Sequence, residues 1–477
     1  MKTETDRILI KILERIVPQK AERNSVENIA KNIISKVENE SNKSSLNSKV
    51  SLEGSVAKDT WLSGEADIDI FLQVDSKLER KDLETTCMEV ARRAIRGYEP
   101  IERFAEHPYI ETLVGKTRVN IVPCYRVEKG NWKSATDRTP YHTAYVKKHL
   151  DSKLRNEIRL LKKFMKGIGT YGAEIRVGGF SGMLCETLIL FYKSFYETIR
   201  AATSWKNRTV VDLENHYDND FEEILDLFDH PFIVIDPIDE NRNVSAAVTE
   251  KKLWEFVSAS RLFLDRPDTS FFFPTQVKKL SKKQLHNILI NSGTNIIGVH
   301  IADIGAPVDV IWSQIYKAEK SIINLLNSHG FSVLRSSSFS NEKNFNIIIV
   351  ELETRILSKT LKHLGPPVEK KTESERFLLT HLRNKDTISG PWIEKNRWVT
   401  NKKREQIDAK QVLKENLSNG GRHFGIPNLI ANQIIKKKFG ILADNEIQRF
   451  FYIPEFSSFM HSHLKGKPSW LSTRSLE

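Results

Sequence analysis

Residues 54–71, which read GSVAKDTWLSGEADIDIF, decide the fold of this chain. From residue 66 onward apolar and polar side chains alternate, which predicts a strand with one buried face. Asp67 and Asp69 lie two positions apart and project from the same face, whereas Ile68 and Ile70 face the core. Two carboxylates whose Cα atoms are about 7 Å apart can converge on hard cations. The stretch therefore predicts a strand that presents a pair of metal-binding carboxylates.

The start of the same stretch has the features of a phosphate-binding turn. Gly54 and Ser55 follow an expected strand and precede a helical turn, where free backbone N–H groups and a hydroxyl can hold triphosphate oxygens. Lys58 adds a positive charge one turn later. An Asp-x-Asp pair alone would also suit the solvated face of an edge strand. Together with the Gly-Ser turn about ten residues before it, the pair is typical of a polymerase-beta-like nucleotidyltransferase with two Mg²⁺ ions.

A chain of 477 residues is too long for one core, and about 100–200 residues per domain suggests three or four domains. Near residue 147 the strand alternation gives way to helical periodicity. A β-α-β-β order over 294–353 fits a small RNA-binding-like module, and the basic tail reads as helical, with one strand around Trp392–Val399. We expect an α+β multidomain protein with a mixed-sheet nucleotidyltransferase head (1–147), a helical central domain (148–258), a small α/β RNA-binding-like module (259–357) and a basic C-terminal region (358–477).

The charge balance favours a polyanionic partner. The chain has 73 Lys plus Arg against 61 Asp plus Glu, a formal net charge of +12. Such an excess raises affinity for phosphates by counterion release, although a generally basic surface is the simpler alternative. In the C-terminal half, basic clusters alternate with aromatic residues, as in proteins that contact RNA by shape and backbone. These groups are Lys370–Lys371, Lys402–Arg404, Lys436–Lys438, Trp392, Trp398 and Phe450–Tyr452.

Several protein classes are excluded by what the sequence lacks. The three cysteines, Cys87, Cys124 and Cys185, show no zinc-ligand spacing, and their odd number argues against a disulfide framework. The first residues do not form a signal peptide, and no apolar stretch approaches the roughly 18–20 residues of a membrane span. We expect a soluble, cytoplasmic protein without membrane contact. The sequence leaves open whether it forms a homodimer.

Six segments of the sequence resemble the archaeal, class I CCA-adding tRNA nucleotidyltransferases, and they occur in that family's order. They are GSVAKDTWLSGEADIDIF (54–71), HPY (107–109), NIVPCY (120–125), DRTPYHTAYV (137–146), YGAEIRVGGFSGMLCE (171–186) and DPIDENRNVSAAV (236–248). The resemblance implies that the chain adds C, C and A to the tRNA 3′ end from CTP and ATP, without a template and with release of pyrophosphate. It also implies two Mg²⁺ ions as cofactors.

The resemblance assigns roles to individual residues. It places Asp67 and Asp69 on the metal ions, and the nucleotide on Ser55, Lys58, His142, Lys162, Tyr171 and Arg242. The guanidinium group of Arg242 has a fork of hydrogen-bond donors suited to recognising a base. Without the family, His142 and Tyr171 read as ordinary packed or surface residues. Lys162 reads as part of the solvated face of a basic helix.

Two positions depart from the family pattern. Lys58 stands where the family more often has Arg, which keeps the charge but loses the bidentate fork. Asn120 stands where the family has its third metal-binding carboxylate, and offers only a neutral oxygen. The chain could be a form of low activity, whether natural or engineered. It could also manage with a carboxamide ligand, or recruit another carboxylate such as Glu65, which shares the parity of the Asp pair.

Two other functions compete with CCA addition. One is a different polymerase-beta-like RNA nucleotidyltransferase, such as a poly(A) or oligoadenylate synthase, which would ignore CTP. The other is a catalytically impaired or dead tRNA-binding homologue, suggested by Asn120. It would bind tRNA and nucleotide yet extend nothing.

Overall fold

The computed structural model describes residues 4–104 and 107–471, so the ends of the first and last predicted regions, 1–3 and 472–477, lie outside the described residues. The chain forms two compact units. Residues 1–276 together with 468–477 make the first, and residues 277–467 make the second. None of the described helices is both long and apolar enough to cross a membrane.

The first unit contains the predicted mixed sheet, in the order β1-β2-β5-β4-β3. Its strands are β1 (Ser48–Glu53), β2 (Asp67–Asp75), β3 (Ile101–Phe104), β4 (Pro108–Val114) and β5 (Thr117–Arg126). Strands β2 and β5 run parallel, and every other neighbouring pair is antiparallel. The strand expected from residue 66 onward and the strand expected before Gly54 are therefore confirmed to within a few residues.

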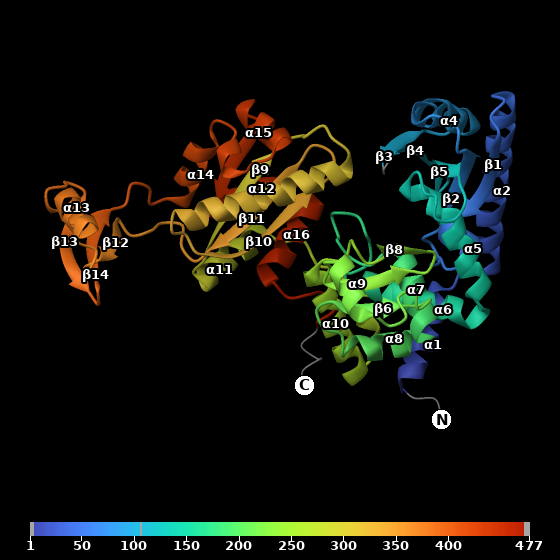
Figure 1. Cartoon of the computed structure of the whole chain (residues 1–477), viewed down its shortest axis with the longest axis horizontal. Helices are drawn as coiled ribbons and strands as arrows, with labels where there is room; N and C mark the ends of the chain where they lie inside the picture. The colour runs from blue at the N-terminus through green and yellow to red at the C-terminus, as the bar shows by residue number, and fades with distance from the viewer. Residues whose placement is uncertain (1–3, 105–106, 472–477) are drawn as a thin grey trace. The chain divides into compact units, whose positions relative to one another are not determined.

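Two helices cover one face of this sheet, α2 (Lys20–Lys43) and α4 (Arg80–Ala94) (Figure 1). Ile68, Ile70 and Leu72 of β2 are fully buried there, in one core with Val37 of α2 and Met88 of α4. Because side chains alternate along a strand, the opposite face carries the polar residues of β2. Three short elements lie near that face: α3 (Gly54–Lys58), η1 (Ala135–Arg138) and α5 (Thr139–His149).

The rest of the first unit is built around an aromatic core. Phe164 lies at its centre, with the rings of Phe195, Phe256, Phe263, Phe271 and Phe272 around it at centroid distances of 5.4–6.1 Å. The helices that supply this core are α1 (Glu4–Ile16), α6 (Ser152–Gly167), α7 (Gly182–Tyr192), α8 (Phe195–Ala202), α10 (Glu250–Asp265) and η2 (Thr269–Phe271). The end of the chain returns to it, because Trp470 is 4% exposed and stacks on Phe271.

The middle region is mainly helical, as expected, but it also contains strands that were not predicted. It contains a three-stranded sheet of β6 (Thr209–Asp212), β7 (Phe232–Asp236) and β8 (Asp239–Asn243), with α9 (Phe221–Leu227) beside it. Strand β7 is buried along its whole length, so its apolar run has no period that separates it from a buried helix. Strand β8 reads Asp-Glu-Asn-Arg-Asn and shows no apolar alternation.

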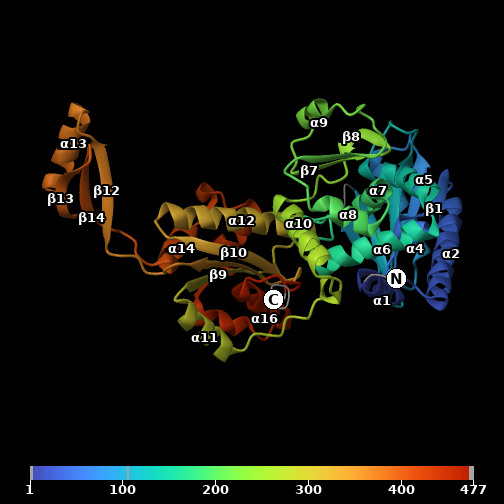
Figure 2. The same cartoon turned by 90° about the horizontal axis from the view of Figure 1, so that it is seen from below.

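The second unit centres on an antiparallel sheet in the order β10-β11-β9-β15. Its strands are β9 (Asn295–Ile301), β10 (Val333–Ser340), β11 (Asn346–Leu352) and β15 (Phe439–Ala443), so the predicted β-α-β-β order is confirmed. Helices α12 (Val308–Ser328), α14 (Ala409–Leu417) and α15 (Asn428–Ile435) pack on one face. The other face is covered by α11 (Lys282–Ser292), η4 (Asp444–Phe450) and α16 (Pro454–Lys465) (Figure 2).

The tail was expected to be helical with one strand around Trp392–Val399; the described residues contain the helices but four strands instead of one. A second sheet is made by β12 (Thr360–Pro367), β13 (Thr387–Glu394) and β14 (Arg397–Lys403), with α13 (Lys371–Leu382) packed on it. The segment Trp392–Val399 is a hairpin that turns at Lys395, whose φ is +55°. A short 3₁₀ helix, η3 (Arg422–Phe424), lies between α14 and α15.

Candidate active site

Asp67 and Asp69 lie on β2 and share the sheet face opposite the helices. Strand β5 runs parallel to β2 and places Asn120 directly beside Asp69. Burial raises the pKa of Asp69 to about 6, against the hydrogen bond from Asn120, which lowers it. Burial also raises the pKa of Asp67, against the charge of Arg118, whose Nε lies 3.8 Å from Asp67 Oδ1. Both carboxylates are thus held where a bound cation would relieve their desolvation and mutual repulsion.

Asn120 is oriented as a hydrogen-bond donor toward this pair. Its Nδ2 donates to Asp69 Oδ1 at 2.9 Å, while its Oδ1 is buried without a partner among the described residues. A half-turn of the amide would exchange these atoms and bring the oxygen to the side of Asp69. Two carboxylates and one carboxamide oxygen fit a hard divalent cation. Within the described part of the chain no group of three His, Cys, Asp or Glu side chains could hold a metal ion.

Glu65 does not join the pair. It lies in the loop before β2 and makes ion pairs with Lys166 and, at 3.8 Å, with Lys163. The carboxylate that sequence reasoning missed is Glu111 on β4, which stands opposite Asn120 in the β4–β5 register and therefore on the same sheet face. Arg103 donates to Glu111 at 3.0 Å, so this carboxylate already has a cationic partner.

The turn before α3 passes directly over Asp69. Gly54 has φ +70°, and a Cβ at this position would lie 2.1 Å from Asp69 Oδ2. Only glycine is compatible with both the backbone conformation and the contact. Ser55 follows as the second residue of α3, and Arg159 fixes the chain beyond it by donating to the carbonyls of Asp59 (2.6 Å) and Trp61 (2.9 Å). The predicted phosphate-binding turn is therefore held rigidly against the carboxylate strand.

Lys58 and Lys162 meet at one buried carboxylate. Lys58 Nζ lies 2.5 Å from Glu186 Oε2, and Lys162 Nζ lies 3.1 Å from Glu186 Oε1, which also accepts from the Thr60 hydroxyl at 2.7 Å. Lys58, Lys162 and Glu186 are 7%, 3% and 1% exposed. Lys162 is therefore not part of a solvated face. Glu186, at the end of the YGAEIRVGGFSGMLCE segment, was not singled out from the sequence.

The charged groups of this cluster shift one another's pKa values. Burial would raise the pKa of Glu186, but the ammonium groups of Lys58 and Lys162 lower it to about 2. Burial lowers the pKa of Lys162, and Glu186 opposes this shift. The cluster places two lysine amino groups around one carboxylate, so its basic groups outnumber its acidic one and can attract an anion.

His142 and Arg242 are brought together by Asp236, another residue that the sequence did not single out. His142 Nε2 lies 2.8 Å from Asp236 Oδ2, and Arg242 Nη1 donates to the same oxygen at 2.6 Å. Asp236 is fully buried at the end of β7. Burial would raise the pKa of Asp236, but the hydrogen bond from His142 and the charge of Arg242 hold it below its usual value.

Tyr171 lies in the loop before α7 and forms an isolated β-bridge with Phe180. A Cβ at Gly182 would meet Tyr171 Oη at 3.1 Å and Lys162 Nζ at 3.8 Å, so both side chains approach the same glycine. Lys166 lies over the Tyr171 ring, 5.0 Å from its centroid. Burial raises the pKa of the Tyr171 phenol well above its usual range. The hydroxyl therefore stays protonated at neutral pH and can donate a hydrogen bond to an anion.

The basic clusters of the second unit differ in exposure. Lys436–Lys438 follow α15 and Lys370–Lys371 begin α13, and all five are exposed. Arg404, at the end of β14, instead donates to the carbonyls of His329 and Ser358. Arg404 is therefore partly structural.

A paired-carboxylate strand beside a glycine-serine turn, in a mixed sheet backed by two helices, defines a nucleotidyltransferase of the polymerase-beta-like class. Comparison with family models agrees with this class. A nucleotidyltransferase domain model matches residues 32–142, a model of the second domain of tRNA nucleotidyltransferase matches 156–273, and a model of the C-terminal domain of the CCA-adding enzyme matches 292–444. Nucleotidyltransferases of this fold generally use divalent metal ions.

Curated relatives match nearly the whole chain. The CCA-adding enzyme of Methanothermobacter thermautotrophicus is 34% identical over 423 residues, which cover 87% of this chain and 90% of that protein. The CCA-adding enzyme of Methanosarcina barkeri is 36% identical over 85% of this chain and 88% of its own length. That of Halobacterium salinarum is 32% identical over 98% of this chain and 100% of its own length. The chain belongs to the family of CCA-adding enzymes.

Proposed function

We propose that this protein adds C, C and A to the 3′ end of tRNA from CTP and ATP, without a nucleic-acid template, and releases pyrophosphate. The observation that carries this proposal is the match to CCA-adding enzymes over head, central and C-terminal domains alike. A poly(A)-type transferase would be expected to share the head alone. The identity extends through residues 292–444, which argues for the same substrate, tRNA.

We propose that Asp67 and Asp69 hold two Mg²⁺ ions, with Asn120 as a third, neutral ligand. The support is the shared face of the two carboxylates and the unpartnered buried oxygen of Asn120 among the described residues. Bound there, Mg²⁺ supplies activation of the tRNA 3′ hydroxyl and charge neutralisation of the leaving pyrophosphate. The chain's own residues then have to bind and orient the triphosphate.

Ser55, Lys58 and Lys162 are the proposed triphosphate ligands. Their support is the rigid turn over Asp69 and the excess positive charge around Glu186. Tyr171 would add a phenolic donor next to Lys162. His142 and Arg242 would act as one assembly on the nucleotide, since Asp236 orients both, and the half-exposed Arg242 has donors left to read a base.

The tRNA is proposed to contact the exposed basic groups of the second unit, Lys370–Lys371 and Lys436–Lys438. Every residue of the proposed nucleotide site lies in the first unit. We place the protein in the cytoplasm, where its proposed substrate, tRNA, is matured.

The decisive experiment incubates the protein with Mg²⁺ and tRNA transcripts that end before C74, after C74 or after C75. CTP alone should extend the first two, ATP alone should extend only the third, and both together should yield the full CCA end. Long A tails made from ATP alone on any transcript would instead indicate a poly(A)-type enzyme. Binding of tRNA without any extension, also with the Asn120→Asp variant, would indicate a tRNA-binding protein.

A further inference from the structure

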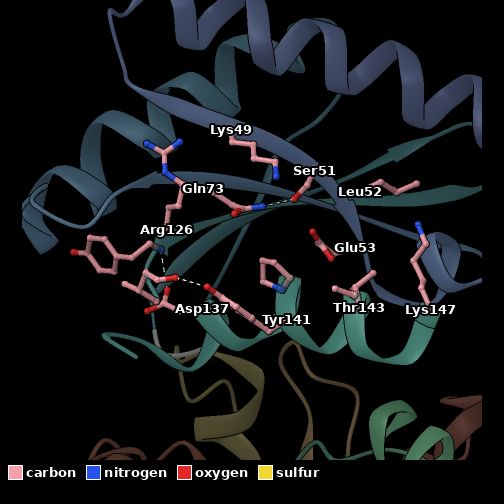
Figure 3. Close-up of a pocket in the computed structure, with 14 residues that line it drawn as sticks. Lys49, Ser51, Leu52, Glu53, Gln73, Arg126, Asp137, Tyr141, Thr143 and Lys147 are labelled. Atoms are coloured by element: carbon pink, nitrogen blue, oxygen red, sulfur yellow. Dashed lines mark hydrogen bonds between the residues drawn. The ribbon is translucent and has the colours of Figure 1, made fainter. Parts of the chain in front are cut away.

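The sheet face that carries Asp67 and Asp69, here called the carboxylate face, has two unlike sides. On the β1 side, helix α5 packs over the face, and the two elements line a cavity of about 440 Å³ (Figure 3). The turn at Gly54 directly follows β1, so the proposed triphosphate site belongs to this covered side. On the side of β5 and β4 the face reaches solvent, because the Arg118 side chain is 52% exposed and Leu113 is 57% exposed. A substrate can therefore approach the carboxylates across this open side.

Arg118 stands next to the carboxylate pair on the open side. It is the partner of Asp67 in the parallel register of β2 and β5, and it lies two positions before Asn120, so it shares their face. Its Nε atom lies 3.8 Å from Asp67 Oδ1 and 3.7 Å from Glu111 Oε2. Both distances exceed that of a hydrogen bond, and Arg118 donates none to any residue that the structure describes. Its five N–H donors are therefore available to a ligand.

A second arginine makes the open side cationic. Arg103 on β3 donates to Glu111 Oε1 from Nη2 at 3.0 Å and from Nε at 3.3 Å, and its side chain is 40% exposed. Glu111 thus lies between two guanidinium groups and limits where each can point. The exposed Leu113 is the register partner of Arg118 on β4. An apolar side chain beside an arginine with available donors suits a ligand that combines a phosphate with a sugar or a base.

The geometry of phosphoryl transfer indicates which substrate reaches this side. The attacking and leaving oxygens lie roughly in line, on opposite sides of the reacting phosphorus. With the triphosphate at the Gly54 turn, which passes over Asp69, the leaving pyrophosphate lies on the covered side. The 3′ hydroxyl of the RNA then approaches from the side of β5, where Asn120 and Arg118 lie. The 5′ phosphate of the same terminal nucleotide is only one ribose away from this hydroxyl.

We propose that Arg118 binds the phosphodiester that joins the last two nucleotides of the RNA to be extended. Its guanidinium fork makes two charge-assisted hydrogen bonds to the phosphate, and Glu111 keeps the fork on the open side. Leu113 packs against the terminal ribose. A phosphate contact carries no base information, so Arg118 serves the addition of C and of A alike. The inference rests on the proposed function, because it takes an RNA with a 3′ hydroxyl as the substrate.

The test replaces one phosphate of the RNA by a neutral methylphosphonate. The RNA is a hairpin with the sequence of a tRNA acceptor stem that lacks only the terminal A, substituted either at its last linkage or three linkages further inside. Fluorescence anisotropy measures the affinity of the full-length protein for each hairpin with Mg²⁺ and without nucleotide, so that nothing is extended. The substitution at the last linkage should weaken binding by the wild type about tenfold, as expected for the loss of a charge-assisted contact.

Arg118→Ala should bind the unsubstituted hairpin and the hairpin with the substituted last linkage equally, at the lower of the two wild-type affinities. Arg118→Lys should keep part of the difference, because a lysine holds a phosphate as a point charge. Arg126→Ala is the matched control and should keep the full difference, since Arg126 is an exposed arginine about 26 Å further along β5. The inner substitution should affect the wild type and Arg118→Ala to the same extent. Arg118→Ala should also keep the thermal midpoint of the wild type, because the side chain is exposed.

Equal affinities of the wild type for the unsubstituted hairpin and the hairpin with the substituted last linkage overturn the proposal, and so does an undiminished difference in Arg118→Ala. Tighter Mn²⁺ binding by Arg118→Ala together with an undiminished difference would assign Arg118 to neutralising Asp67 instead. The binding measurement is independent of the incorporation assay. Normal incorporation of CTP and ATP with no Arg118-dependent difference sinks only the present inference, whereas an Arg118-dependent difference without incorporation sinks only the proposed activity.

Discussion

Glu186→Gln should destabilise the first unit by about 3 kcal/mol at pH 7. The carboxylate accepts from Lys58, Lys162 and Thr60, and all four side chains are buried. Its pKa falls from 4.5 to about 2 on folding, and about 1.4 kcal/mol per unit gives this magnitude. Breaking a buried ion pair by removing one partner costs a similar amount, about 3–5 kcal/mol. The variant keeps the shape of the side chain and loses only its charge.

The pH dependence of this loss follows from the sign of the shift. Because folding lowers the pKa of Glu186, its contribution to stability is fully present above about pH 4.5 and disappears as the pH falls toward 2. The free energy of unfolding of wild type and variant should therefore differ by a constant amount between pH 5 and pH 8. Urea unfolding, followed by tryptophan fluorescence, measures the difference.

Glu197→Gln provides the control for this variant. Glu197 lies on the neighbouring helix α8, and its side chain is 41% exposed and paired with Arg200 at the surface. Its loss should change stability by less than about 0.5 kcal/mol. A cost below about 1 kcal/mol for Glu186→Gln would refute the account of the buried cluster, because two unpaired buried ammonium groups would then be tolerated.

Three further outcomes are expected. Asp67→Ala and Asp69→Ala should each abolish incorporation of C and A. The affinity for tRNA should stay within about twofold, since tRNA binding depends on many distant basic contacts. Near wild-type turnover in either variant would exclude a metal-binding role. Neutralising Lys436–Lys438 together should reduce the slope of the logarithm of tRNA affinity against the logarithm of salt concentration by up to about 3, with the affinity for ATP unchanged. An unchanged slope would assign these lysines to a solvated surface. Asn120→Asp should raise the Mg²⁺-dependent turnover at least about tenfold with little change in nucleotide affinity, because it restores a charged ligand; a fast wild type that gains nothing would contradict this reading.

The parts of the fold that follow from local periodicity could be predicted. The alternation over residues 66–74 places Asp67 and Asp69 on one face because strand geometry fixes that relation within a few residues. The Gly54-Ser55 turn is equally local. The three-stranded sheet of the central region could not be predicted, since β8 has no apolar alternation and β7 is apolar on both faces.

The contacts between residues of the site could not be predicted for a different reason. Glu186 meets Lys58 across 128 residues of sequence, and Asp236 meets His142 across 94. No local pattern encodes such a contact, which depends on how helices and strands pack. Lys162 illustrates the error that follows: on a helix crowded with basic residues it reads as solvated, yet it points inward to a carboxylate. The sequence identifies many residues of this site, but only the structure shows which of them contact one another.

The return of the chain's end to the first unit has a consequence for its synthesis. The second unit, residues 277–467, is inserted between Gln276 and Pro468, and so has two covalent tethers to the first. Trp470, which packs against Phe271 in the aromatic core, emerges from the ribosome long after the helices of that core, and only Leu471 of the described core residues follows it. A nascent chain or a fragment that stops before residue 470 would leave this ring face bare and prone to aggregate. The first unit is thus begun before the second unit and is completed after it, when residues 468–471 have been synthesised.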